Sequence, residues 1–192
     1  MGKYVTNIID NESLKEVVHL IRNGYTDLDG VPHKPNPQIA TILILQANMG
    51  CRIGDIVNMR KEDIVFDSNA WKLNIIEEKT GKARPFIIPR PVKDIIDMYC
   101  KDNAINSGRL FTIKKHAVWK QMRAVTKYLG LENTSCHSLR KASAMRVYIS
   151  SGKDIALTCD YLNHSSPKTT MRYLKRSSKQ MDEAISKSVI LL

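Results

Sequence analysis

The sequence has little that would tie the protein to a membrane, an oxidising compartment or a zinc site. Its longest apolar run, from Ile39 to Met49, is too short to span a bilayer, and no signal-peptide pattern is present. The four cysteines are far apart and show neither a Cys-x-x-Cys pair nor zinc-ligand spacing. We therefore expect reduced thiols in a cytoplasmic protein, with no membrane partner.

Acidic side chains are scarce in the second half of the chain. Residues 1–96 hold 13 Lys and Arg against 12 Asp and Glu, whereas residues 97–192 hold 17 against 7. The formal net charge of +11 is therefore concentrated in the C-terminal half. This asymmetry favours a polyanionic partner that binds mainly to that half, although a solvated basic surface would show the same charge without any partner.

Hydrophobic periodicity predicts a mainly helical domain with one small antiparallel sheet, which is an α+β fold. The chain has 192 residues, of which 43% are hydrophobic, enough for one well-packed domain. Helices are predicted over 11–22, 39–49, 52–59, 91–101, 114–129, 139–150 and 181–192, with short ones starting at 154 and 167. Strands are predicted over 63–67, 71–77 and 84–88, and a loop rich in Gly, Pro and Asp over 24–37.

Six polar side chains in four short motifs supply two guanidiniums, one ammonium, two imidazoles and a phenol. They are Arg52, Lys79, His137, Arg140, His164 and Tyr173. A guanidinium forks onto two phosphate oxygens and never loses its charge, and a phenol becomes an oxygen nucleophile once its proton is taken or its anion is stabilised. The set suits one task, which is to hold a phosphodiester while an oxygen nucleophile attacks it.

In its order and chemistry, this set resembles the catalytic domain of the tyrosine recombinases, the phage-integrase family. The resemblance spans roughly residues 35–176 and includes His164 nine residues before Tyr173. It implies that Tyr173 attacks a DNA phosphate, forms a 3′-phosphotyrosyl link and frees a 5′-hydroxyl, which a partner strand then reverses. No nucleotide cofactor is implied, because the link keeps the bond energy, and no metal, because organic cations clamp the phosphate.

The resemblance also assigns roles to the other members of the set, and some alternatives stay open. Arg52 and Arg140 clamp the phosphate, His137 accepts the tyrosine proton or donates to the phosphate, and His164 donates a second hydrogen bond. Lys79 is the general acid, with Lys82 in the same turn as a rival. Asp55 either orients Arg52 or merely forms a surface salt bridge with it. Asn163 replaces the usual glycine before the histidine, and it tolerates left-handed backbone.

The predicted organisation has three parts: an N-terminal helix and loop (1–34), the catalytic core (35–176) and a C-terminal tail helix (177–192) that protomers can exchange. The expected partners are double-stranded DNA and further copies of the chain in a tetrameric synapse. Integrases usually carry DNA-binding domains before the catalytic one, so an excised catalytic domain and a short inverting recombinase both fit. Two other functions compete: a type IB topoisomerase-like nicking-closing enzyme and a non-catalytic basic DNA-binding protein.

Overall fold

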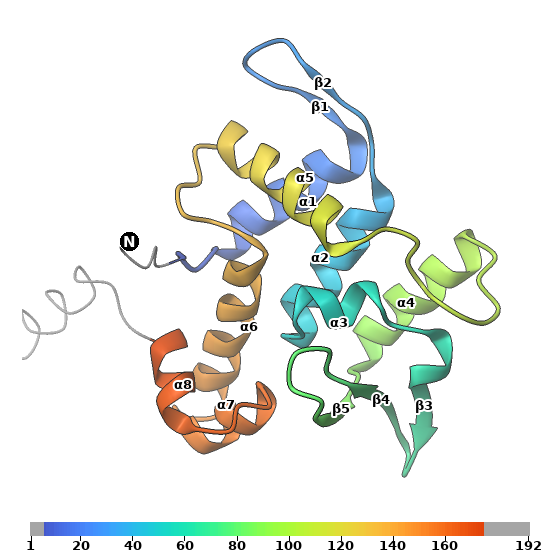
Figure 1. Cartoon of the computed structure of the whole chain (residues 1–192), viewed down its shortest axis with the longest axis vertical. Coiled ribbons are helices and arrows are strands. Elements are labelled where there is room, and N and C mark those ends of the chain that lie inside the picture. Colours follow the sequence, from blue (N-terminus) through green and yellow to red (C-terminus); the bar gives the residue numbers. More distant parts are fainter. Residues whose placement is uncertain (1–5, 175–192) are drawn as a thin grey trace, which may run out of the picture.

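The computed structural model describes residues 6–174 of the chain, and within them it confirms the α+β class (Figure 1). The helices are α1 (Asn11–Asn23), α2 (Pro37–Met49), α3 (Ile53–Val57), α4 (Arg90–Asp102), α5 (Lys115–Tyr128), α6 (Cys136–Ser150), α7 (Ile155–Tyr161) and α8 (Pro167–Tyr173). A 3-10 turn occupies Lys61–Asp63. The helix predicted over 181–192 lies outside the described residues.

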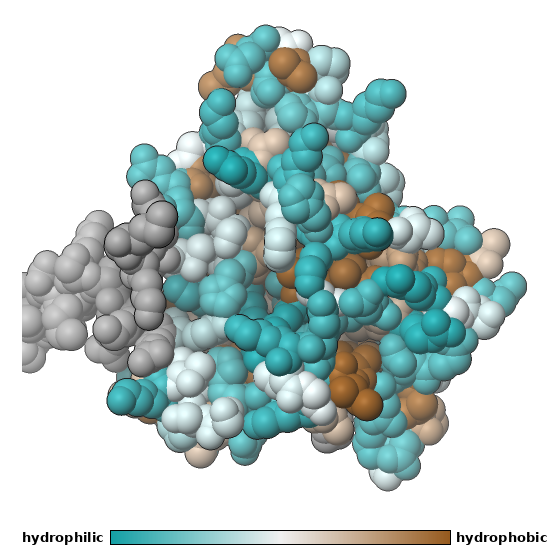
Figure 2. Space-filling view, viewed as in Figure 1, coloured by the Kyte–Doolittle hydropathy of each residue, from teal (hydrophilic) through white to brown (hydrophobic). Residues whose placement is uncertain are grey.

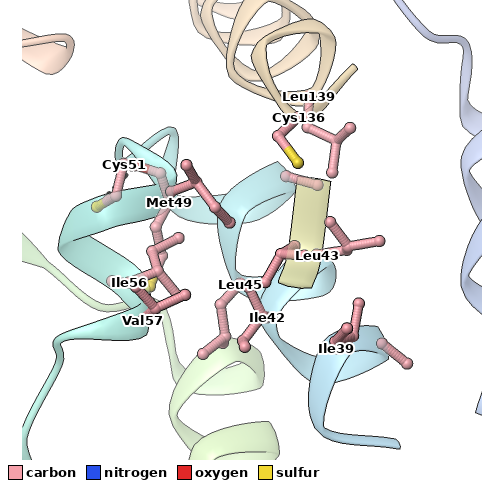
Figure 3. Packing of buried hydrophobic residues seen from close by; sticks show 14 of the residues in the cluster. Ile39, Ile42, Leu43, Leu45, Met49, Cys51, Ile56, Val57, Cys136 and Leu139 are labelled. Atoms are coloured by element: carbon pink, nitrogen blue, oxygen red, sulfur yellow. Dashed lines mark hydrogen bonds between the residues drawn. The ribbon is translucent and has the colours of Figure 1, made fainter. Parts of the chain in front are cut away.

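The centre of the molecule is α2, which is apolar nearly all round its surface. Asn36 caps its first turn by accepting a 3.0 Å hydrogen bond from the Ile39 amide, and Gly50 ends it in the left-handed conformation, with φ of 62°. Figure 3 shows side chains of α2 packed against Ile56 of α3 and Leu139 of α6. A helix that is hydrophobic on all sides needs such neighbours.

The sheet is antiparallel, with β3 (Ile64–Asp67), β4 (Ala70–Ile76) and β5 (Ala83–Ile87) in that order. Pairing of Ile76 with Ala83 leaves a six-residue connection, 77–82, between β4 and β5. Leu73 on β4 is fully buried and anchors the sheet to the core. Figure 1 shows the β4–β5 turn beside α3 and directed toward α6.

Three predicted elements differ from the structure. The loop predicted over 24–37 contains a short hairpin of β1 (Tyr25–Thr26) and β2 (Pro32–His33), whose two-residue strands are too short to show alternation. The helix predicted over 52–59 is shorter, because Arg52 is its N-cap and Asn58 its C-cap. The helix predicted from residue 139 begins three residues earlier, because Ser135 caps α6.

The surface in Figure 2 is mostly hydrophilic, with its hydrophobic side chains in small separate groups. Exposed apolar residues on the strands include Phe66, Ile76 and Ile87. All four cysteines are buried. Within residues 6–174, no helix combines the length and the apolar character that crossing a bilayer requires.

Candidate functional site

All six predicted site residues line one cavity of about 520 Å³. It lies where α3, α6, α8 and the β4–β5 turn converge, with α2 and α5 each adding one side chain, Gln46 and Trp119, to its lining. The remaining lining residues are Gln46, Ile53, Trp119, Ser135, Cys136 and Thr169. The structure therefore brings together side chains that the sequence separates by more than a hundred residues.

Arg140 forms the buried wall of the cavity, with 1% of its surface exposed. Its Nη1 donates to the Gly50 carbonyl oxygen at 2.6 Å, and its Nη2 donates to the Leu162 carbonyl oxygen at 2.8 Å. A glycine is required at position 50, because the backbone is left-handed and a Cβ there would lie 2.7 Å from the Tyr161 hydroxyl oxygen. The guanidinium is thus fixed in place before any phosphate enters.

His164 lies at the end of a tight turn in which Asn163 has a φ of 51°. Its Nε2 is 3.3 Å from Nη2 of Arg140, and its Nδ1 is 3.0 Å from Oγ1 of the buried Thr170. Because a guanidinium can only donate, Nε2 is the acceptor and the Nδ1–H group of the neutral ring donates to Thr170. His164 is therefore held at both ring nitrogens and is not a surface or capping histidine.

The phenol of Tyr173 stands between the two imidazoles. Its ring centroid is 4.9 Å from that of His137 and 5.0 Å from that of His164, and both contacts are edge-on. Tyr173 is the last residue of α8, which Ser166 caps and Pro167 opens. The short helix fixes the spacing between His164 and Tyr173, and so brings both rings to one place.

His137 lies one helical turn before Arg140 on α6, at the rim of the cavity. Much of His137 is exposed, but the protein atoms on the cavity side of the ring remove part of its hydration and lower the pKa of His137 to about 4, and the nearby charges of Lys141, Arg140, Lys79 and Arg52 add to this effect. The imidazole is therefore neutral at physiological pH, able to accept a proton. A bound phosphodiester would oppose these cations and raise the pKa again.

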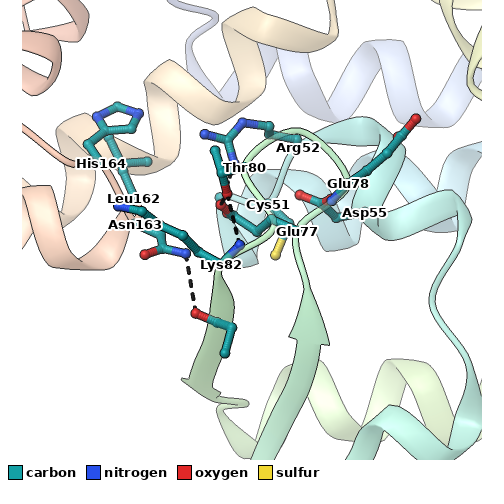
Figure 4. A network of polar contacts seen from close by, with 12 residues as sticks. Cys51, Arg52, Asp55, Glu77, Glu78, Thr80, Lys82, Leu162, Asn163 and His164 are labelled. Carbon is teal, nitrogen blue, oxygen red and sulfur yellow. Dashed lines mark hydrogen bonds and ion pairs between the residues drawn. The ribbon is translucent and has the colours of Figure 1, made fainter.

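Arg52 is the second guanidinium of the cavity, and its ionic partner is not the one that the sequence suggested. Its Nη1 is 2.6 Å from Oε2 of Glu77, in an ion pair without hydrogen-bond alignment. Asp55 instead accepts a 2.9 Å hydrogen bond from the Glu78 amide (Figure 4). Both alternatives considered for Asp55, a surface salt bridge with Arg52 and direct orientation of Arg52, are therefore wrong.

Asp55 is nevertheless part of the electrostatics of the site. It is 5% exposed, and this burial raises the pKa of its carboxyl group, with the Glu77 carboxylate adding to the increase. The hydrogen bond from the Glu78 amide and the charges of Arg52 and Arg140 act in the opposite direction. Asp55 thus influences Arg52 through its charge while it holds the start of the β4–β5 turn.

The β4–β5 turn carries both candidate lysines. Lys79 lines the cavity, whereas Lys82 is not among its lining residues. Both lysines are exposed, and the Lys82 amide lies 3.4 Å from Oγ1 of Thr80. The placement of the two side chains thus favours Lys79 of the two as the group that reaches a bound phosphate.

Two residues that hold Arg52 and His164 in place, Glu77 and Thr170, were not predicted from the sequence. A signal existed for Glu77, because alternation along β4 puts it on the same face as Leu73 and Ile75, toward the core. A carboxylate on a buried face needs a partner. No comparable signal marked Thr170. Within residues 6–174 there is no group of three or more His, Cys, Asp or Glu side chains that could hold a metal ion.

Comparison with known proteins places this site in context. The model of the phage integrase family matches residues 13–180. Tyrosine recombinase XerA of Pyrococcus horikoshii is 30% identical over 159 residues, which are 78% of this chain and 54% of XerA. The probable integrase/recombinase YoeC of Bacillus subtilis is 31% identical over 139 residues, which are 69% of this chain and 75% of YoeC.

A solved structure shows the same fold. The recombinase XerH, in a post-cleavage complex with its palindromic difH substrate, superposes with a TM-score of 0.67 at 17% identity, over 94% of this chain and 52% of XerH. The chain thus spans about half the length of XerA and of XerH.

Proposed function

The chain belongs to the phage integrase family, and on that premise we propose that it is a site-specific DNA recombinase that breaks and rejoins DNA through a 3′-phosphotyrosyl intermediate. One observation carries the proposal: the phenol of Tyr173 shares a cavity with two guanidiniums, a lysine and two imidazoles, and contacts both imidazoles edge-on. A non-catalytic DNA-binding protein has no need of such an arrangement.

The two arginines would clamp the scissile phosphate. Negative charge builds on the non-bridging oxygens during phosphoryl transfer, and preorganised cations in a protected cavity stabilise it. Arg140 is fixed by two backbone carbonyls and Arg52 by a buried carboxylate, so neither needs to reorganise when the charge develops. This is electrostatic catalysis supplied by the chain's own side chains.

Proton transfer would involve His137 and Lys79. The phenol oxygen of Tyr173 attacks phosphorus, and its proton passes to the neutral His137. The bond from phosphorus to the 5′-oxygen breaks, and Lys79 gives that oxygen a proton. Rejoining reverses each step with a 5′-hydroxyl of a partner strand as nucleophile.

The first role of His164 would be to orient its neighbours Arg140 and Tyr173. Because both of its ring nitrogens have partners, it holds Arg140 and packs against Tyr173. Direct donation from His164 to the phosphate requires that the phosphate displace the contact with Arg140 and that Nε2 carry a proton, through protonation of the ring or a change of tautomer.

The partners of the whole protein are part of the same proposal. Double-stranded DNA fits the net charge of +11, and XerH was solved in complex with its palindromic difH substrate. We propose a tetrameric synapse, with residues 35–176 as the catalytic core, 1–34 leading into it and 177–192 exchanged between protomers. The wide spacing of the four cysteines, without a Cys-x-x-Cys pair, favours a reducing, cytoplasmic compartment.

A nicked suicide duplex carrying the attachment site tests the proposal, because the broken end diffuses away and traps the covalent intermediate. The wild-type protein should give a DNA adduct on a denaturing gel, and Tyr173→Phe should give none while it still binds DNA. Absence of any wild-type adduct would contradict recombinase chemistry. Relaxation of supercoils without strand exchange between two sites would indicate the topoisomerase-like alternative instead.

A further inference from the structure

Glu77 is a buried carboxylate at the entrance to the turn that carries Lys79. It follows β4 directly, and none of its side chain is exposed. Burying an ionised carboxylate is costly unless a cation or hydrogen bonds compensate for the lost water. The partners of Glu77 therefore show which groups it holds.

One oxygen of Glu77 contacts two different parts of the site. Its Oε2 is 2.6 Å from Nη1 of Arg52 and accepts a 2.8 Å hydrogen bond from the hydroxyl of Thr80 (Figure 4). Arg52 belongs to the N-terminus of α3, and Thr80 directly follows Lys79. The carboxylate thus bridges the phosphate clamp and the turn.

The backbone of Glu77 closes the same turn. Its carbonyl oxygen accepts from the amides of Thr80 at 3.3 Å and Gly81 at 2.9 Å, and its own amide donates to the Lys82 carbonyl oxygen at 3.0 Å. On the opposite side, the buried Asp55 holds the amide of Glu78. Lys79 therefore projects from a turn that two buried carboxylates attach to the body of the domain.

We propose that Glu77 is a positioning residue that couples Arg52 to Lys79, an inference that rests on the proposed recombinase function. It fixes the guanidinium that holds the phosphate and the turn that presents the proton donor. The two groups keep their mutual distance because a single oxygen contacts both segments. Glu77 itself touches no reacting atom.

Two substitutions separate the two contacts. Glu77→Gln keeps an acceptor for Thr80 but loses the charge that holds Arg52. Thr80→Val keeps the ion pair and removes one hydrogen bond that orders the turn. Glu78→Gln is the matched control, because this carboxylate is one residue away, half exposed and paired with Lys115.

Cleavage rates at saturating DNA are measured on two suicide substrates, one with the normal 5′-oxygen and one with a 5′-sulfur leaving group. Sulfur leaves without a proton, so it bypasses the proton donor. On the oxygen substrate, Glu77→Gln should be slower than wild type by about 10- to 100-fold, since a misplacement of about 1 Å costs about 10²-fold. Thr80→Val should be slower by about 3- to 10-fold, the equivalent of one hydrogen bond.

The sulfur substrate then distinguishes the two contacts. Thr80→Val should recover to the wild-type rate on it, whereas Glu77→Gln should keep most of its defect, because the clamp is still misplaced. Glu78→Gln should cleave both substrates at a rate within about twofold of wild type. A change of that size is smaller than the loss of one hydrogen bond would cause.

Wild-type rates for Glu77→Gln, or no recovery of Thr80→Val on sulfur, would overturn the coupling. Melting temperatures identify a variant that fails to fold. If Glu77→Gln fails to fold, the rates of Thr80→Val on the two substrates decide alone, because Thr80 is exposed and its substitution should not disturb folding. If the wild-type protein forms no adduct on either substrate, the proposed function itself fails, and this inference with it.

Discussion

Nη1 of Arg140 donates a 2.6 Å hydrogen bond to the carbonyl oxygen of Gly50, which lies 90 residues earlier in the chain. Nη2 of the same guanidinium donates to Leu162, on the turn that leads to His164. One side chain therefore holds together the loop before Arg52 and the turn before His164. Its loss should affect the fold as well as the chemistry.

Arg140→Ala should lower both the free energy of unfolding and the rate of cleavage. Each buried carbonyl that loses its donor costs about 1–3 kcal/mol, and loss of a preorganised transition-state donor costs about 10²–10³ in rate. Chemical denaturation and adduct formation measure the two effects. Tyr173→Phe is the control, with cleavage lost and stability nearly unchanged. An Arg140→Ala protein as stable as wild type would contradict the structural role.

Lys79→Ala should lose about 10²-fold or more in cleavage of a normal substrate, because general acid catalysis contributes about 10²–10⁴. A 5′-sulfur leaving group should restore its rate. Lys82→Ala is the matched variant, since Lys82 is in the same turn but does not line the cavity. It should cleave both substrates at nearly the wild-type rate. The reverse pattern would move the general acid to Lys82.

The neutral state of His137 should appear in the pH dependence of stability. Its pKa is about 4 in the folded chain and 6.5 as a free side chain, so below pH 6.5 the unfolded state binds a proton that the folded state does not. His137 therefore contributes stability above pH 6.5 that is lost as the pH falls toward 4. Denaturation at pH 7, 5.5 and 4.5 should show a shallower pH dependence for His137→Gln than for wild type. Equal slopes would contradict the lowered pKa.

Asn163→Gly should be tolerated, because glycine adopts the observed φ of 51° without strain. Asn163→Val should be destabilising by about 1–2 kcal/mol, because a β-branched side chain fits left-handed backbone poorly, whereas Asn tolerates it. Melting temperature and adduct formation check both variants. Because the next residue is His164, the Val variant should also cleave more slowly. Normal cleavage by the Val variant would show that this turn does not position His164.

The sequence predicted which side chains form the site, but not which partners hold them. Arg52 shows why: Asp55 lies three residues away and is an obvious candidate, yet Glu77 forms the ion pair. That contact depends on where the β4–β5 turn packs against α3, which no local pattern determines. The family resemblance supplied the set of six residues, whereas the contacts between distant segments required the structure.

Helices and strands were predicted well only where the signal lies within the segment itself. Helices with long apolar patterns, such as α2, were predicted nearly to the residue, since burial and caps act within the segment. The β1–β2 hairpin was missed because each strand has only two residues, although stacking of Tyr25 on His33, with centroids 4.4 Å apart, gives the pair a tertiary reason to form. The start of α6 was missed because a serine cap at Ser135 is a weaker signal than an apolar face.

Tyr173, both guanidiniums and both imidazoles line one cavity within a single chain. A copy that lacks the phenol and a copy that lacks Arg140 each have an incomplete cavity. Mixing the two copies therefore cannot restore a complete one. If the chain is the recombinase proposed above, a cell that makes both normal and Tyr173→Phe subunits would contain copies that occupy DNA without cutting it, and these copies would compete with the normal subunits for the same sites.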